Sequence, residues 1–110
     1  MVIKQGDIIK FDFNPALGHE QQGYRPALVV SNNAYNKYTN LLIVLPITNA
    51  DNDFPLHIKL DHRTTTTGVI LCEHIKSIDK TVRKINKIEV LPKDIFEHVI
   101  AMIHGEIDIK

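Results

Sequence analysis

Side chains that can bind a phosphate or move a proton gather in residues 18–26, GHEQQGYRP. This segment holds an imidazole at His19, a carboxylate at Glu20 and a guanidinium at Arg25. A guanidinium presents a planar fork of N–H groups that matches two phosphate oxygens. A carboxylate or an imidazole can accept a proton from a hydroxyl group. Together these residue types favour chemistry at a phosphate.

Two strands are expected to position this chemistry. Arg25 precedes Pro26, so its backbone is biased toward the extended region, and the apolar run of residues 27–31 follows. Thr48 closes a second apolar run, residues 41–47. An arginine and a threonine at strand ends could hold the charge that develops on phosphorus. Each also has an ordinary alternative, Arg25 as a surface partner of Glu20 and Thr48 as a hydroxyl that satisfies a turn.

The remaining pattern predicts a mainly β chain that ends in a helix. Residues 9–13, 56–60, 69–72, 75–79 and 82–90 give further strand candidates, and long polar connections span residues 14–24 and 61–68. Residues 32–40 are predicted as a polar connection, and Pro46 is expected at an edge or a bulge. Ile95, Val99, Met102 and Ile103 then recur at helical spacing. We predict a helix at about residues 93–104, with Pro92 at its first position and Gly105 near its end. Short strands followed by one helix favour a small β-barrel with the helix packed on it.

Metal or thiol chemistry has little support in the sequence. A zinc-binding helix that began at His19 would need a second histidine one turn later, but position 23 is glycine. His57 and His62 lack a nearby ligand of suitable spacing. Cys72 is the only cysteine and lies in an apolar run, where thiols are usually inert. We therefore expect no metal and no cofactor.

Length and charge limit the class of protein. The 110 residues predict one domain over residues 1–110, and 13 basic residues balance 13 acidic ones. A neutral chain does not coat nucleic acid through bulk charge, although a local phosphate site stays possible. The sequence shows neither a signal peptide nor an apolar run that could span a membrane. We expect a cytoplasmic protein.

The ordered motifs resemble the MazF/PemK family of toxins from toxin–antitoxin modules. GHEQQGYRP followed by ALVVS is the most distinctive block. The other matching motifs follow in order along nearly the whole chain: Gly6-Asp7-Ile8, Asn14-Pro15, Tyr35-Asn36, Pro46-Ile47-Thr48, Gly68-Val69, Lys76-Ser77-Ile78-Asp79 with Arg83, and the helix after Pro92.

The resemblance implies both a fold and an activity. The fold would be a small SH3-like β-barrel, like that of MazF and CcdB, which forms a homodimer. The activity would be a metal-independent endoribonuclease that cleaves single-stranded mRNA at a short sequence, leaving 2′,3′-cyclic phosphate and 5′-hydroxyl ends. The implied partner is a cognate antitoxin that lays a disordered acidic segment over the RNA site.

The resemblance also implies roles for individual residues. Arg25 and Thr48 match the family's catalytic pair, with Arg25 assigned to transition-state charge and Thr48 to a phosphate oxygen. Arginine is a poor proton donor because its pKa lies above about 12, so we prefer Glu20 or His19 as the base and leave the acid unassigned. The expected RNA contacts lie on the polar loop and on a second wall at residues 49–54 and 61–68, with two more after residue 72: Gln21, Gln22, Tyr24, Asn49, Phe54, Thr67, Glu73 and His74.

Two departures and two rivals bear on these assignments. Leu71 stands where the PemK branch has an arginine, and His74 replaces the usual glutamine. Glu73 stands where that branch has a catalytic aspartate, so it is a further candidate for the base. A gyrase inhibitor of the CcdB type would need a C-terminal tryptophan, and this chain has no tryptophan. A non-catalytic barrel that serves as a binding module is the other alternative.

Overall fold

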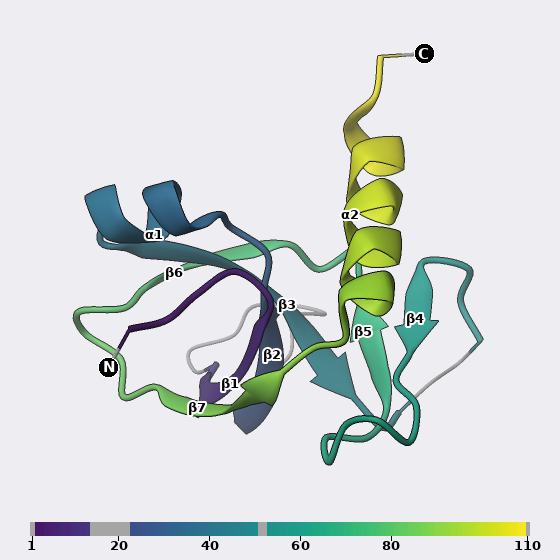
Figure 1. The fold of residues 1–110 in the computed structure, drawn as a ribbon, viewed down its shortest axis with the longest axis horizontal. Coiled ribbons are helices and arrows are strands. Elements are labelled where there is room, and N and C mark those ends of the chain that lie inside the picture. The colour runs from purple at the N-terminus through teal and green to yellow at the C-terminus, as the bar shows by residue number, and fades with distance from the viewer. Residues whose placement is uncertain (1, 14–22, 51–52, 110) are drawn as a thin grey trace.

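The computed structural model describes residues 2–13, 23–50 and 53–109, and it is mainly β with a C-terminal helix, as the sequence predicts (Figure 1). All strand pairs within these residues are antiparallel. The elements are β1 (Asp7–Asp12), β2 (Tyr24–Val29), α1 (Asn33–Tyr38), β3 (Leu41–Thr48), β4 (His57–Lys59), β5 (Val69–Leu71), β6 (Lys76–Asp79), β7 (Asn86–Val90) and α2 (Lys93–Ile107).

Strand β3 joins two parts of the sheet. The strand order is β4-β5-β3-β2-β1-β7, and β6 also pairs with β3. Leu41 to Val44 pair with β6, whereas Ile47 and Thr48 pair with β5. Pro46 lies between these two segments and pairs with Ala27 of β2. A proline cannot donate to a ladder, so the gap between β6 and β5 is where a central strand tolerates one.

Two apolar cores lie on opposite faces of the central strands, because successive side chains of a strand alternate between faces. One core contains Ile8, Leu28 and Leu45, and α2 covers it together with β4 and β5 (Figure 1). The other core contains Ile9, Ala27 and Val44, with Phe11 and Phe13 at 4.2 Å between ring centroids. The central strands are therefore buried on both faces, as their apolar runs predict.

Helix α2 begins at Lys93, where the helix is predicted to begin, and runs past its predicted end at residue 104. Pro92 is the residue before the first turn rather than the first helical residue. Gly105 lies inside the helix, which continues to Ile107, and a side chain at position 105 would meet no neighbour within 4 Å. Ile95 and Val99 form the buried stripe that the apolar spacing predicts.

The predicted polar connection at residues 32–40 is wrong, because it contains helix α1. Asn32 caps this helix by accepting a hydrogen bond from the Tyr35 backbone N–H at 2.8 Å. Asn36 is buried and donates to the Ser31 carbonyl at 3.0 Å. Asparagine satisfies caps and buried backbone groups as readily as it forms turns, and this explains the error.

Other strand limits shift as well. Strand β2 begins at Tyr24 and ends at Val29, so it starts before and ends before the predicted run of 27–31. The predicted strand at residues 82–90 shortens to β7, Asn86–Val90. Over the ranges described, no helix is both long enough and apolar enough to cross a membrane.

Candidate active site

The register of β2 and β3 brings Arg25 toward Thr48. Ala27 of β2 lies opposite Pro46 of β3, and each step toward the loop moves one residue along each strand. Extending this register two residues beyond its last pair sets Arg25 across from Thr48. Because Ala27 and Pro46 face the same side, Arg25 and Thr48 do so too. Arg25 is exposed and Thr48 is buried, which is the arrangement expected at the rim of a core.

Gly68 is packed against Thr48. A Cβ at position 68 would lie 2.3 Å from the Thr48 carbonyl oxygen, and Gly68 has a φ of +110°, a backbone conformation that residues with side chains rarely adopt. The Thr48 hydroxyl oxygen accepts a hydrogen bond from the Ala50 N–H at 3.1 Å. These contacts fix the backbone at the end of β3, so the hydroxyl projects from a rigid position.

A second arginine lies near Arg25, and the sequence prediction gave it no catalytic or RNA-binding role. Phe11 of β1 pairs with Arg25. The Arg83 guanidinium lies 5.6 Å from the centroid of the Phe11 ring and donates to the Asp12 carbonyl. Two guanidinium groups therefore share one end of β1 and β2. The only sequence signal for Arg83 is its place in the family motif.

Glu73, His74 and Phe54, three of the predicted RNA contacts, meet around His57. The His57 Nε2 lies 2.8 Å from the Glu73 Oε2, and the His57 and Phe54 rings form an edge contact at 5.4 Å between centroids. The His74 Nε2 is 3.7 Å from the same carboxylate oxygen. His57 is on edge strand β4, yet its side chain is only 7% exposed. It is a pairing residue that sequence spacing does not reveal.

A second carboxylate, that of Glu106, interacts electrostatically with Glu73 in this cluster. The Glu73 Oε1 and the Glu106 Oε2 are both buried, and neither has a hydrogen-bond partner among the residues that the structure describes. Burial, and then the charge of Glu73, raises the pKa of the Glu106 carboxyl. Glu106 therefore takes up a proton more readily than an exposed glutamate does.

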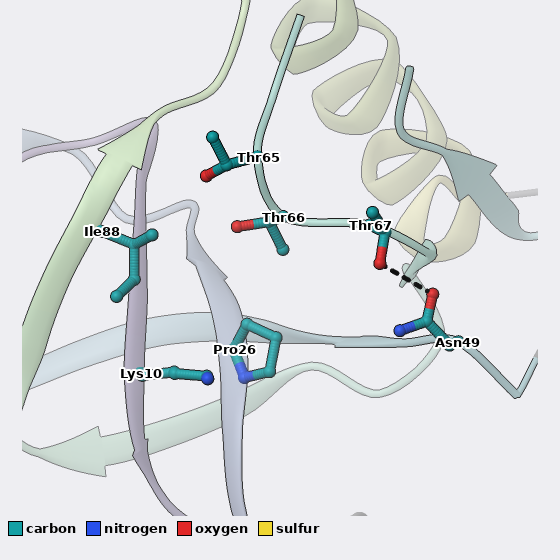
Figure 2. A pocket seen from close by; sticks show the side chains of 7 residues that line it. All are labelled: Lys10, Pro26, Asn49, Thr65, Thr66, Thr67 and Ile88. Atoms are coloured by element: carbon teal, nitrogen blue, oxygen red, sulfur yellow. Dashed lines mark hydrogen bonds between the residues drawn. The ribbon is translucent and has the colours of Figure 1, made fainter. Parts of the chain in front are cut away.

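Asn49 and Thr67, two further predicted RNA contacts, line one cavity of about 350 Å³. The Thr67 hydroxyl donates to the Asn49 Oδ1 at 3.1 Å. Figure 2 shows these two side chains at one side of the cavity lining, with Lys10 and Pro26 opposite Thr65 and Thr66. The cavity offers hydroxyl, amide and ammonium groups, which suit a nucleotide base or a phosphate.

Tyr24 adjoins this cavity and not the Arg25 side of the sheet. The Lys10 Nζ lies 5.6 Å from the centroid of the Tyr24 ring, and the Asn86 amide donates to the Tyr24 hydroxyl at 2.5 Å. Neighbouring residues of a strand face opposite sides, so Tyr24 and Pro26 share a face that excludes Arg25. The predicted residues thus occupy two faces at one end of the sheet.

Glu89 of β7 holds the loop of residues 64–67, here called the threonine loop, in place. Its carboxylate accepts hydrogen bonds of 2.7 to 3.0 Å from the backbone N–H and hydroxyl groups of Thr65 and Thr66. Burial raises the pKa of this carboxyl, but the hydrogen bonds from both threonines outweigh burial and lower it overall. The loop that lines the cavity is therefore held in a fixed shape.

Four predicted residues, His19, Glu20, Gln21 and Gln22, lie outside the described residues. Within the described ranges, no group of three His, Cys, Asp or Glu side chains is arranged to hold a metal ion. Cys72 is buried, and burial followed by the charges of Glu106 and Glu73 raises its thiol pKa to about 12. A thiolate nucleophile is thus disfavoured at Cys72.

Comparison with known proteins identifies the family of this chain. A family model described as PemK-like, MazF-like toxin of type II toxin–antitoxin system matches residues 4–105. The chain belongs to this family. Among curated relatives, it is 33% identical to the endoribonuclease PemK of Escherichia coli over 105 residues, covering 92% of this chain and 79% of that protein. It is 35% identical to the endoribonuclease EndoA of Bacillus subtilis (strain 168) over 104 residues, covering 90% and 89%.

Solved structures show the same fold for this PemK/MazF chain. MazF from Deinococcus radiodurans matches with a TM-score of 0.90 and 32% identity, covering 96% of each chain. A MazE–MazF structure from the same organism matches with a TM-score of 0.87 and 28% identity, covering 100% of each chain. The relatives are named endoribonucleases, so neither the gyrase inhibitor nor the non-catalytic module is favoured.

Proposed function

We propose that this chain is a sequence-specific, metal-independent endoribonuclease toxin of single-stranded mRNA. The observation that carries the proposal is the β2–β3 register, whose extension by two residues would set Arg25 across from Thr48 on one face of the sheet. Family membership and the names of the relatives support the same activity. We take residues 1–110 as one toxin domain.

The proposed reaction uses the 2′-hydroxyl of the substrate as the nucleophile. Its oxygen attacks the adjacent phosphorus, the bond from phosphorus to the 5′ oxygen breaks, and the proton of the 2′-hydroxyl passes to a base. The products are a 2′,3′-cyclic phosphate and a 5′-hydroxyl end, which takes up a proton. DNA lacks the attacking hydroxyl, so it should not react.

Arg25 and Thr48 stabilise the charge of the transition state. The Arg25 guanidinium contacts the phosphate oxygens that gain charge, and the Thr48 hydroxyl donates to one of them. Glu20 or His19 is the proposed base, Glu73 is a third candidate, and the acid is not assigned. Because the carboxylate of Glu73 is engaged with His57, we prefer the two loop residues.

Partners and location complete the proposal. The RNA would contact Tyr24, Asn49, Thr67, Phe54, Glu73 and His74 together with the loop residues Gln21 and Gln22. A cognate antitoxin with a disordered acidic segment would cover this surface, the toxin would act in the cytoplasm, and unchecked cleavage would arrest growth.

A homodimer would form through an apolar hollow of about 330 Å³ beside α2, where Ile75 and Ile107 are 44% and 69% exposed.

Digestion of a long single-stranded RNA in EDTA tests this proposal. The wild type should give discrete cuts with 5′-hydroxyl ends, and Arg25→Ala should lose at least about 10²-fold in rate, because it removes a donor to the charged phosphate. Lys93→Ala, which removes an exposed cation on α2, is the matched control and should cut normally. Full cleavage by a folded Arg25→Ala variant would reject the assignment of Arg25.

A further inference from the structure

A basic groove runs from α1 toward the Arg25 end of the sheet. One cavity of about 480 Å³ is lined by Lys4, Lys37 and Lys80, and its floor includes Val2 and Ile3. A second cavity of about 350 Å³ is lined by Lys80 and Arg83, with Ile3 again on its wall. Because Lys80 and Ile3 line both cavities, the two hollows adjoin each other. We call Lys4, Lys37, Lys80 and Arg83 the basic groove.

The groove leads to the proposed catalytic pair. Arg83 stacks over Phe11, and Phe11 is the cross-strand partner of Arg25. Ile3 and Ile85, which line the second cavity, pack on the core that lies beneath Phe11. In Figure 1 the N-terminal segment, α1 and the connection from β6 to β7 occupy the same side of the molecule. The groove and Arg25 therefore share one face of the sheet.

Among the described residues, the lining of the two cavities holds four cationic side chains and no carboxylate. The Lys80 Nζ donates to the Asn36 carbonyl, which anchors it between α1 and β6. Lys4 and Lys37 are exposed. Asp79 is the neighbouring acidic residue, and its carboxylate accepts hydrogen bonds from the Thr81 N–H and hydroxyl, which lower its pKa. In a chain of zero net charge, four cations along one path make a distinct positive surface.

We infer that this groove binds the phosphate backbone of the RNA strand beyond the cleavage site. This inference rests on the proposed function for its substrate. Cations along a path, with apolar side chains between them, suit a single strand, because phosphates contact the cations and base faces contact the apolar floor. An acidic protein segment would use the same charges, but the contact of Arg83 with Phe11, the cross-strand partner of Arg25, favours the nucleic acid.

Salt-dependent binding tests the groove without any cleavage. The probe is a long 2′-O-methyl oligouridine, which lacks the attacking hydroxyl and any specific sequence. The variant is Lys4→Gln/Lys37→Gln, since both side chains are exposed and neither anchors the fold. The matched control is Lys59→Gln/Lys93→Gln, which removes two exposed lysines on β4 and α2.

The groove variant should bind the oligouridine roughly fivefold more weakly than the wild type at low salt. The slope of log affinity against log salt should fall in magnitude by about 1.4, since each lost phosphate contact to a single strand contributes about 0.7. The control variant should match the wild type. On a cleavable long RNA, the groove variant should raise KM and leave kcat unchanged.

The other outcomes either overturn the inference or separate it from the proposed cleavage. An unchanged slope in the groove variant, or no binding of the oligouridine by the wild type at low salt, would exclude a phosphate path. If the groove variant weakened the binding of polyglutamate and left the oligouridine unaffected, the surface would serve an acidic protein segment. If the wild type cleaved no RNA but the slope still fell as expected, the proposed cleavage would fail and the groove would stand.

Discussion

At the scale of single residues, the proposed site combines an exposed cation, Arg25, with a buried hydroxyl, that of Thr48. Arg25 can reach a phosphate oxygen because it stands at the open end of β2. Thr48 can orient a hydroxyl because its side chain is buried and its backbone is pressed by Gly68. Placing donors rigidly before the reaction begins is what gives such groups their catalytic effect.

Replacing Thr48 by valine tests the role of the hydroxyl. Thr48→Val keeps the shape of the side chain but removes the donor, so kcat should fall about 10²-fold with KM little changed. Thr39→Val is the control, because it also removes a hydroxyl that bonds to backbone, the Tyr35 carbonyl, but at the end of α1. Initial rates on a mapped RNA substrate measure both. Equal kcat in Thr48→Val and the wild type would remove Thr48 from the mechanism.

Sequence reasoning could place some residues of the site and not others. Arg25 and Thr48 end two buried runs that are close in sequence, and consecutive strands usually pair, so their proximity can be predicted. The pairing of His57 with Glu73 cannot, because it depends on how β4 and β5 form their own register. Arg83 also escapes prediction, since its place over Phe11 depends on the course of the β6–β7 connection.

At the scale of elements, two glycines illustrate how the position of a glycine decides the free-energy cost of replacing it by alanine. A side chain at Gly68 would collide with the Thr48 carbonyl at 2.3 Å, in a backbone conformation with φ of +110°. Gly68→Ala should therefore lose about 2–4 kcal/mol of unfolding free energy and also lose activity. Gly105→Ala should gain about 0.5–1 kcal/mol, because alanine is the better helix former and the space there is open.

Urea denaturation of both glycine variants measures these changes. Opposite signs for the two substitutions are the expected result. A neutral Gly68→Ala would mean that the turn before β5 can move away from Thr48, and the rigidity ascribed to Thr48 would then be wrong.

Glu89 makes the threonine loop dependent on pH. Its carboxyl has a lower pKa in the folded protein than its ordinary value of 4.5, so the folded state binds fewer protons. The stabilisation by Glu89 is therefore present above pH 4.5 and is lost as the pH falls through the folded pKa. Glu89→Gln should cost roughly 1–2 kcal/mol at pH 7 and should flatten this part of the acid profile.

Thermal unfolding from pH 7 down to pH 3 checks the role of Glu89. Glu97→Gln is the control, because Glu97 is exposed on α2. An acid profile of Glu89→Gln that follows that of the wild type would show that the loop is held by something else.

At the scale of the whole molecule, the fold class follows from pattern, while the limits of its elements follow from packing. The alternation of residues 9–13 and the helical stripe after Pro92 predict the mainly β chain with its terminal helix. Helix α1 escapes this reasoning because its stability comes from the Asn32 cap and the buried Asn36, and not from an apolar stripe. Helix α2 passes Gly105 because the packing of its other face outweighs the low propensity of glycine.

The apolar hollow beside α2 makes a prediction about assembly. Light scattering should give the mass of a dimer, because the hollow leaves Ile75 and Ile107 exposed on one surface that Ile43 and Ile103 also line. Ile75→Glu/Ile107→Glu should give a folded monomer, because two carboxylates would be buried without partners. Val82→Glu, at an equally exposed apolar residue outside this hollow, should remain dimeric. A dimer that survived the double substitution would place the interface elsewhere.

The change of partner along β3 has a consequence for how the protein opens locally. Beyond Pro46, β3 shares only two register pairs with β5, whereas before it β3 shares four with β6. The amide protons of β4 and β5 should therefore exchange with deuterium earlier than those of β1 and β2. The half of the sheet that carries Phe54, His57 and Glu73 could then adapt to different bases while β2, the strand that bears Arg25, keeps its backbone hydrogen bonds. Substrate choice would in that way gain a freedom of movement that the strand of Arg25 does not share.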